Sequence, residues 1–162
     1  MKRYIPIFLL TLVAAGTAHE ARAQFQLGAR GGYDLETDDA LIGVEARFGL
    51  NNPALPLIIA PAFDYYFLDI DDASFYELDL NVLYPFGINN QTFTPYAGAG
   101  LGVGFLSFDD GDESETDTDL GLNLVGGAVF GFGGIRPFAQ ARLKLGGDME
   151  LATLHGGVLF IL

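Results

Sequence analysis

Eight charged side chains stand inside otherwise apolar segments, at spacings that suit ion-pair chemistry. Glu77 and Asp79 are two residues apart, as are Arg142 and Lys144. Side chains alternate between the two faces of a β-strand, so each pair shares one face. An unpaired buried charge is very costly, and acids and bases that share one interior are therefore expected to pair. The positions predicted to form one ion-pair network are Arg30, Glu45, Arg47, Asp64, Glu77, Asp79, Arg142 and Lys144.

A second concentration of charge is the segment DDGDESETDTD at 109–119, which suggests calcium binding. An EF-hand loop needs glycine at its sixth position and glutamate at its twelfth. Counted from the first aspartate, these positions hold Ser114 and Leu120, so the match fails. We expect a solvated acidic loop, with weak cation binding as the alternative. The carboxylates available for weak binding are Asp109, Asp110, Asp112, Glu113, Glu115 and Asp117.

Nucleophilic catalysis would depend on His155, because the other histidine, His19, lies in the N-terminal segment. A catalytic histidine needs a nucleophile within reach, but residue 157 is glycine and Thr153 is the nearest hydroxyl. The alternation of the last segment turns His155 inward, and we expect its ring to be satisfied by its neighbours. No enzymatic activity, metal site or cofactor is predicted.

Strands must position these side chains, because a period of two dominates the sequence. In 92–106 the odd positions are apolar, whereas glycine occupies positions 98, 100, 102 and 104. One face therefore suits lipid and the other a crowded interior, as in a narrow membrane barrel. The eight expected strands are 25–35, 41–50, 57–68, 75–86, 92–106, 119–132, 137–146 and 150–162.

The connections between these strands alternate in character. Segments 51–56, 87–92 and 133–136 are short, rich in Asn, Gly and Pro, and free of acidic residues. Segments 36–40, 69–74, 107–119 and 147–150 hold fifteen acidic residues and no basic one. Membrane barrels have short periplasmic turns and longer outer loops, so we expect the acidic connections to face outside.

The N-terminal segment has the features of a cleaved signal peptide. Lys2 and Arg3 precede an apolar run at 4–16, and a small-x-small cleavage site follows at 21–23. The run is too short to span a membrane as a helix. We expect a signal peptide at 1–23 and one barrel domain at 24–162. The absence of cysteine excludes disulfides and thiolate metal sites.

Composition narrows the class further. Residues 24–162 carry 20 acidic and 5 basic side chains, a net charge of −15, which argues against a nucleic-acid partner. The whole chain is nevertheless 50% hydrophobic, which excludes disorder. No run after the signal segment is long enough for a transmembrane helix. An exported, apolar chain of this kind predicts a β-barrel.

In an eight-strand ring, the third and fourth strands lie opposite the seventh and eighth. We therefore expect the carboxylates of 57–68 and 75–86 to face Arg142 and Lys144 across the lumen, with Arg30 near enough to join. Arg30 and Glu45 also form a plausible pair within the first hairpin. Eight strands leave an interior about wide enough for side chains, which favours structural ion pairs over a gated conduit.

Three segments carry a family resemblance: PYAGAGLGVG at 95–104, RPFAQARLKLG at 136–146 and GGVLFIL at 156–162. They resemble the small eight-stranded outer-membrane barrels of the OmpA transmembrane domain, OmpX and Ail. One departure is the last residue, Leu162, where the family usually has an aromatic residue. The resemblance implies the outer membrane of a Gram-negative bacterium, contact with lipid and lipopolysaccharide, and insertion by the barrel-assembly machinery. We also expect a monomer.

The expected fold is an all-β, eight-stranded antiparallel up-and-down transmembrane β-barrel. The expected function is a structural role in membrane integrity, or a surface interaction. The alternative is a narrow, cation-preferring, porin-like pore, because a negative rim concentrates cations. A third interpretation is a soluble lipocalin-type barrel with inverted faces, which is disfavoured because soluble surfaces are dense in Lys and Glu.

Overall fold

The computed structural model describes residues 25–50, 52, 54–69, 73–87, 92–109, 114–132 and 134–162. The expected signal peptide at 1–23 therefore lies outside the described residues, as do Asp110, Asp112 and Glu113 of the acidic segment. Among the described residues, no helix is long and apolar enough to cross a membrane.

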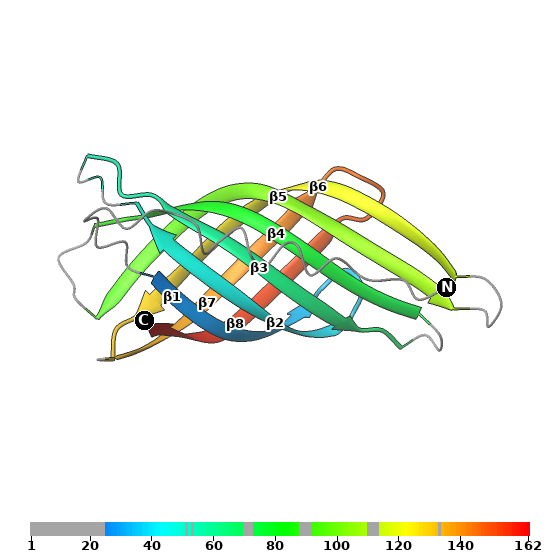
Figure 1. Ribbon diagram of the computed structural model, residues 1–162, viewed down its shortest axis with the longest axis horizontal. Helices are drawn as coiled ribbons and strands as arrows, with labels where there is room; N and C mark the ends of the chain where they lie inside the picture. Colours follow the sequence, from blue (N-terminus) through cyan, green and yellow to red (C-terminus); the bar gives the residue numbers. More distant parts are fainter. Residues whose placement is uncertain are drawn as a thin grey trace, which may run out of the picture.

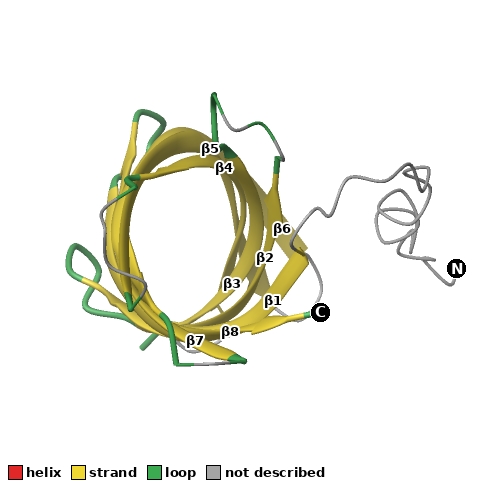
Figure 2. Ribbon diagram, turned by 90° about the vertical axis from the view of Figure 1, so that its left-hand side faces the viewer, coloured by secondary structure: helices red, strands yellow, loops and turns green. Residues whose placement is uncertain are grey.

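Eight strands follow one another around a closed barrel (Figure 1). Every neighbouring pair is antiparallel, and β8 pairs with β1 to complete the ring seen end-on in Figure 2. The structure confirms the predicted fold class. The strands are β1 (Phe25–Asp34), β2 (Ala40–Gly49), β3 (Ile58–Phe67), β4 (Ala73–Pro85), β5 (Phe93–Asp109), β6 (Ser114–Phe130), β7 (Ile135–Leu145) and β8 (Leu151–Ile161).

The two faces of the barrel are inverted relative to a water-soluble protein. Leu80 and Leu122 point outward and are 54% and 61% exposed, whereas Glu77 and Arg142 point inward and are fully buried. Apolar side chains outside and charged ones inside are what a barrel surrounded by lipid requires. This arrangement excludes the lipocalin-type barrel, in which the apolar face would line the interior.

The hairpin of β5 and β6 is longer than predicted. Segment 107–119 was expected to be a loop, but Ser107 pairs with Thr116 and Asp109 with Ser114, so only 110–113 separate the strands. The hydroxyl oxygens of Ser107 and Thr116 are 3.1 Å apart across the ladder. The loop prediction was wrong because the acidic composition indicated solvation, while alternating threonines favoured an extended backbone.

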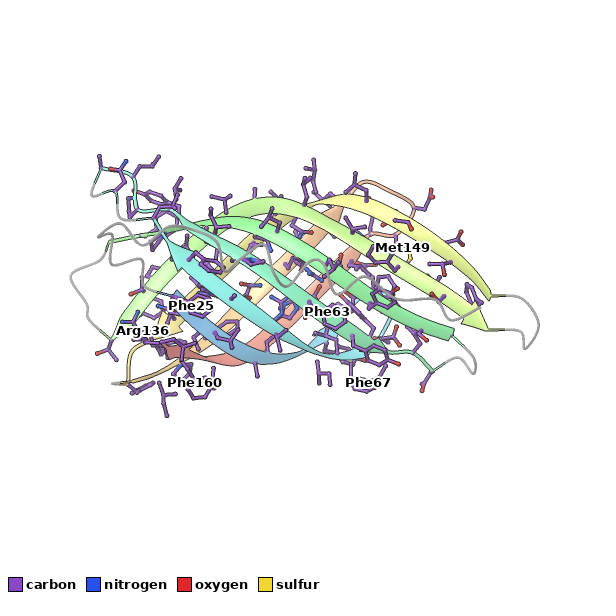
Figure 3. All side chains as sticks on the ribbon, in the orientation of Figure 1. Phe25, Phe63, Phe67, Arg136, Met149 and Phe160 are labelled. Carbon is purple, nitrogen blue, oxygen red and sulfur yellow. The ribbon has the colours of Figure 1, made fainter. Side chains whose placement is uncertain are left out.

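The barrel has two chemically different ends. At the terminal end, the Leu162 amide donates to the Phe25 carbonyl, 3.1 Å away, and Figure 3 places Phe160 and Arg136 near it. The opposite end, here called the acidic end, carries the connections 35–39, 68–72, 110–113 and 146–150. Met149 belongs to this end (Figure 3).

Two apolar layers lie inside the barrel. One layer, towards the terminal end, contains Ala60, Leu83, Tyr96 and Val125. The other, towards the acidic end, contains Leu41, Tyr66, Phe75 and Leu151. Along the inward faces of β3 and β4, the acidic residues fall between members of these two layers. The acidic side chains of β3 and β4 are therefore covered by apolar side chains on both sides.

Gly102 of β5 makes room for charged side chains. A Cβ atom added to Gly102 would lie 2.9 Å from both the Asp79 Oδ1 and Glu77 Oε1 atoms. That separation is shorter than Cβ atoms adopt in real proteins, so the neighbouring carboxylates would have to move. Interiors are close-packed, and the space is already filled. Gly102 therefore leaves the space that these two carboxylates occupy.

A first prediction follows from this packing. Gly102→Val should lower the free energy of unfolding by about 1–3 kcal/mol, because it overpacks the lumen. The matched control is Gly126→Val on β6, where an added Cβ meets nothing within 4 Å. Urea unfolding in lipid vesicles, followed by circular dichroism, compares the two variants. Equal stability of the two would contradict the assigned role of Gly102.

Candidate functional site: the charged lumen

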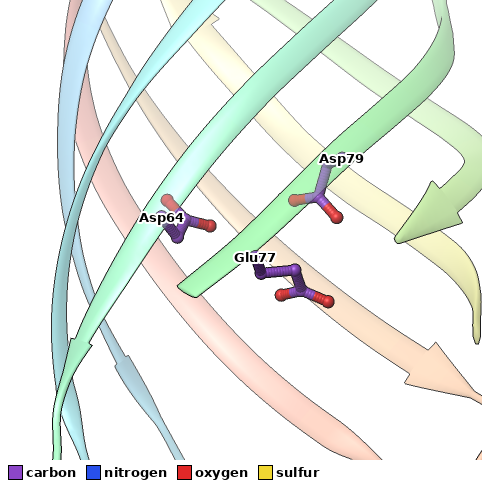
Figure 4. Close-up of side chains that lie close together, drawn as sticks. All are labelled: Asp64, Glu77 and Asp79. Carbon is purple, nitrogen blue, oxygen red and sulfur yellow. The ribbon is translucent and has the colours of Figure 1, made fainter. Parts of the chain in front are cut away.

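Three carboxylates from neighbouring strands form the centre of the lumen (Figure 4). Asp64 of β3 lies directly opposite Glu77 of β4, and Asp79 follows two residues later on the same face. Each offers an oxygen atom within 4.8 Å of the others, and none is more than 4% exposed. Like charges directly opposite one another destabilise a sheet, so this cluster requires cations.

Arg142 of β7 supplies the first cation. Its NH1 group donates to Asp79, and its NH2 group donates to the Glu77 Oε2 atom at 2.5 Å. The NH2 group also donates to the Tyr66 hydroxyl at 2.7 Å, while NH1 lies 3.5 Å from Asp64. One guanidinium therefore contacts all three carboxylates from the opposite wall of the barrel. Charge-assisted bonds of this kind are among the stronger ones in proteins.

Arg30 of β1 supplies the second cation. Its Nε and NH2 groups donate to the two oxygens of Asp64 at 2.8 and 2.6 Å, a bidentate pair. Its NH1 group donates to Glu45 at 2.7 Å, and NH2 reaches Asp79 at 3.3 Å. Arg30 therefore joins the first hairpin to the central carboxylates, through the Glu45 contact expected from the sequence.

Lys144 extends the network towards the acidic end. Its Nζ atom lies 3.3 Å from Glu77 Oε1 and 2.9 Å from Asp119 Oδ2. The lysine is fully buried, and its stem occupies the space beside Gly121, where an added Cβ would come within 2.7 Å of it. Asp119, which the sequence placed in the acidic loop, therefore forms an ion pair with Lys144 of the lumen.

Arg47 extends the network in the other direction. Its Nε group donates to Glu45, and its NH2 group donates to the Tyr96 hydroxyl at 2.9 Å. The guanidinium carbon also lies 4.7 Å from the Tyr96 ring centroid and 4.8 Å from that of Phe138. Aromatic faces attract a cation in this geometry. The structure therefore connects all eight charged residues of the expected network.

Neutral residues complete the network, and the sequence reasoning did not assign them a role. The Asn123 amide donates to Asp79 at 2.7 Å, the Tyr66 hydroxyl donates to Glu77 at 3.1 Å, and the Tyr96 hydroxyl donates to Gln140 at 3.0 Å. The alternation of side chains along each strand already predicted that these side chains point into the barrel. Their hydrogen-bonding capacity was the signal that could have identified them.

Asp34 and His155 are buried polar residues that the predicted ion-pair network did not include. Asp34, one of the inward-facing acids, caps a turn, because its Oδ1 atom accepts from the Glu36 and Thr37 amides at 2.9 and 3.1 Å. The expectation that the His155 ring is satisfied was wrong. Neither ring nitrogen has a hydrogen bond within the described structure, and Nε2 lies 3.5 Å from Asp64 Oδ2.

The carboxylates expected in the acidic loop do not form a described cluster. Asp117 lies in β6 and is exposed. Asp109 and Glu115 lie at the adjoining ends of β5 and β6, where their backbones pair with Ser114 and Phe108. Asp110, Asp112 and Glu113 lie outside the described residues. Weak cation binding by this segment stays a prediction.

The central carboxylates resemble a metal-ligand set, but their chemistry is already satisfied. Two guanidinium groups and one ammonium group contact them, so a metal ion would have to displace a buried cation. Catalysis at His155 has no better support. The Thr153 hydroxyl accepts from Arg142 at 3.3 Å, and both residues face the lumen. The arrangement is suited to holding the barrel wall together.

A closed antiparallel barrel with an apolar outer surface and an ion-paired lumen defines an outer-membrane β-barrel. The family model described as outer membrane protein beta-barrel domain matches residues 9–153, and the chain belongs to that family. A comparison with curated proteins finds no match.

Solved structures share the fold at low sequence identity. The N-terminal barrel of Pseudomonas aeruginosa OprF is similar over 86% of this chain and 98% of its own, with 18% identity and a TM-score of 0.69. Ail of Yersinia pestis is similar over 86% and 97%, with 18% identity and a TM-score of 0.65. The outer membrane enzyme PagL is similar over 85% and 99%, with 14% identity and a TM-score of 0.55. These likenesses show the fold alone.

A second prediction tests the lumen. Arg142→Met should lower the free energy of unfolding by about 3–5 kcal/mol, because it leaves buried carboxylates without their partner. The matched control is Arg136→Met, because the Arg136 side chain is only half-buried and lies at the terminal end. This variant should change the free energy of unfolding by no more than about 0.5 kcal/mol. Both are measured by urea unfolding in vesicles.

The same measurement on Arg142→Met/Glu77→Gln/Asp79→Asn separates lost attraction from lost packing. Neutralising two of the three carboxylates removes most of the uncompensated charge, so this variant should regain part of the stability. A triple variant less stable than Arg142→Met would show that Arg142 acts through packing, not charge.

Proposed function

We propose that this chain is a closed outer-membrane barrel with a structural role in membrane integrity, or a role in surface interaction. The observation that carries this proposal is the network around Arg142, which ties β7 to β3 and β4 across the lumen. Arg30 ties β1 and β2 to the same carboxylates. Fully buried ion pairs, covered by apolar layers, suit a filled barrel better than a conduit.

The acidic end is the proposed outward-facing surface. Exposed acidic residues gather on its connections, and Glu36, Asp69, Asp148 and Glu150 are among them. Lipopolysaccharide phosphates carry the same sign of charge, so contact between the two surfaces needs bridging divalent cations. Under this proposal, the outer leaflet meets the barrel through such cations at its rim and through lipid on its apolar wall.

One observation favours the alternative, a narrow cation-preferring pore. A cavity of about 350 Å³ opens at the terminal end and one of about 500 Å³ at the acidic end. The acidic residues of β3 and β4 and the apolar layers on either side of them lie between the two cavities, while Arg47 lines the cavity at the terminal end. Rearrangement of these ion pairs would join the two cavities, and the acidic rim would then concentrate cations.

A third prediction separates the two functions. The protein in a planar bilayer should show no discrete conductance steps, because the ion pairs span the lumen. Glu77→Gln/Asp79→Asn is measured beside it, with insertion of each protein verified by protease protection. Cation-selective steps in the wild type that change in this variant would replace the structural proposal with the pore.

A fourth prediction concerns orientation. The sequence contains no cysteine, so a single introduced cysteine reports its own position. On intact cells, Thr37→Cys at the acidic end should react with a membrane-impermeant maleimide, whereas Ala54→Cys at the terminal end should react only after the outer membrane is opened. Both positions are exposed in the structure, which makes them a matched pair. Reversed labelling would reverse the assigned orientation.

A further inference from the structure

The cavity of about 500 Å³ at the acidic end has an apolar floor. Phe75 and Leu151, which are 3% and 2% exposed, belong to the apolar layer that covers the charged network. The partly buried Leu68, Leu106 and Met149 pack against that layer. All five line the cavity, so a ligand at this end meets hydrocarbon and an aromatic ring before it meets the lumen charges.

The wall of the same cavity is acidic. Glu36, Asp39, Asp69, Asp148 and Glu150 line it, and none of the described lining residues is basic. These carboxylates come from three separate connections, and their described residues at 36, 39, 69, 148 and 150 line one cavity. Their combined field attracts cations and repels anions. The cavity therefore favours a ligand that combines an apolar group, for the floor, with a positive charge, for the wall.

We propose that this cavity binds an organic cation that carries an apolar group, such as an aryl or alkyl ammonium. The apolar group would occupy the floor, and the charged head would lie among the carboxylates. Phe75 would pack against the apolar group in the floor, and the exposed Phe108 also lines the cavity; an aromatic ring attracts a quaternary ammonium group that lies over its face. The volume falls within the range of small-molecule sites.

Other ligand classes match only half of the site. A hydrated metal ion would gain nothing from the apolar floor, and a neutral apolar molecule would gain nothing from the carboxylates. An anionic lipid headgroup would be repelled by the wall. The inference is independent of conductance, because the Tyr66 and Phe75 rings, 4.7 Å apart between centroids, lie between the cavity and the ion pairs.

A fifth prediction uses Met149 as a reporter of binding. Met1 and Met149 are the two methionines of the sequence, so methyl-labelled methionine gives few signals, and Met149→Leu assigns the one in the cavity. The protein is purified from the outer membrane of an expressing host and placed in zwitterionic lipid nanodiscs. Benzyltrimethylammonium should shift the Met149 signal in a saturable way.

Two smaller ligands test the charged part and the aryl part of benzyltrimethylammonium separately. Tetramethylammonium has the charge without the aryl group, and benzyl alcohol has the aryl group without the charge. Each should bind at least about tenfold more weakly than benzyltrimethylammonium. Equal binding of tetramethylammonium would show that the rim only concentrates cations. Equal binding of benzyl alcohol would show a purely apolar cavity. Either result, or an unmoved Met149 signal, would overturn the proposal.

Variants of the rim test the carboxylates directly. Glu150→Gln should weaken binding of benzyltrimethylammonium about threefold, and Asp69→Asn/Glu150→Gln about tenfold, since exposed ion pairs contribute modestly. Asp38→Asn is the matched control, because Asp38 is exposed at the same end and does not line the cavity. Its backbone φ of 62° is one that asparagine tolerates. An equal loss in Asp38→Asn would overturn the proposed site.

Discussion

The cost of burying like charges side by side organises this barrel. Asp64 and Glu77 face each other on adjacent strands, with Asp79 beside them, and such a cluster is unstable without cations. Arg142 and Arg30 form ion pairs with these carboxylates from other strands of the barrel wall. The space that these side chains need explains Gly102 of β5, and the two apolar layers separate the acidic side chains of β3 and β4 from water at the ends of the barrel.

Much of this arrangement could be predicted from alternation alone. A period of two assigned Glu77 and Asp79 to one face and Leu78 and Leu80 to the other, and the exposures agree. The closed eight-strand ring then placed the carboxylates opposite Arg142. Composition predicted the strands less well than periodicity did. The acidic residues of 107–119 indicated a solvated loop, but most of this segment is paired in an extended hairpin.

Individual hydrogen bonds could not be predicted, because they depend on side-chain reach. Lys144 contacts Asp119, a residue expected in a solvated loop, only because its stem passes beside Gly121. His155 faces the lumen as its parity required, yet its ring nitrogens are left without a hydrogen bond among the described residues. The alternation along a strand determines which face of the sheet a side chain lies on, whereas packing determines which atoms that side chain contacts.

The network also constrains the order in which the barrel can form. Asp79 and Glu77 lie 63 and 65 residues before Arg142, their partner, and Asp64 lies 78 residues before it. A partly assembled sheet of β1 to β4 has Arg30 and Arg47 but lacks Arg142, so its central carboxylates stay costly to remove from water. Entry into lipid is therefore coupled to the arrival of the C-terminal strands, and closure becomes cooperative.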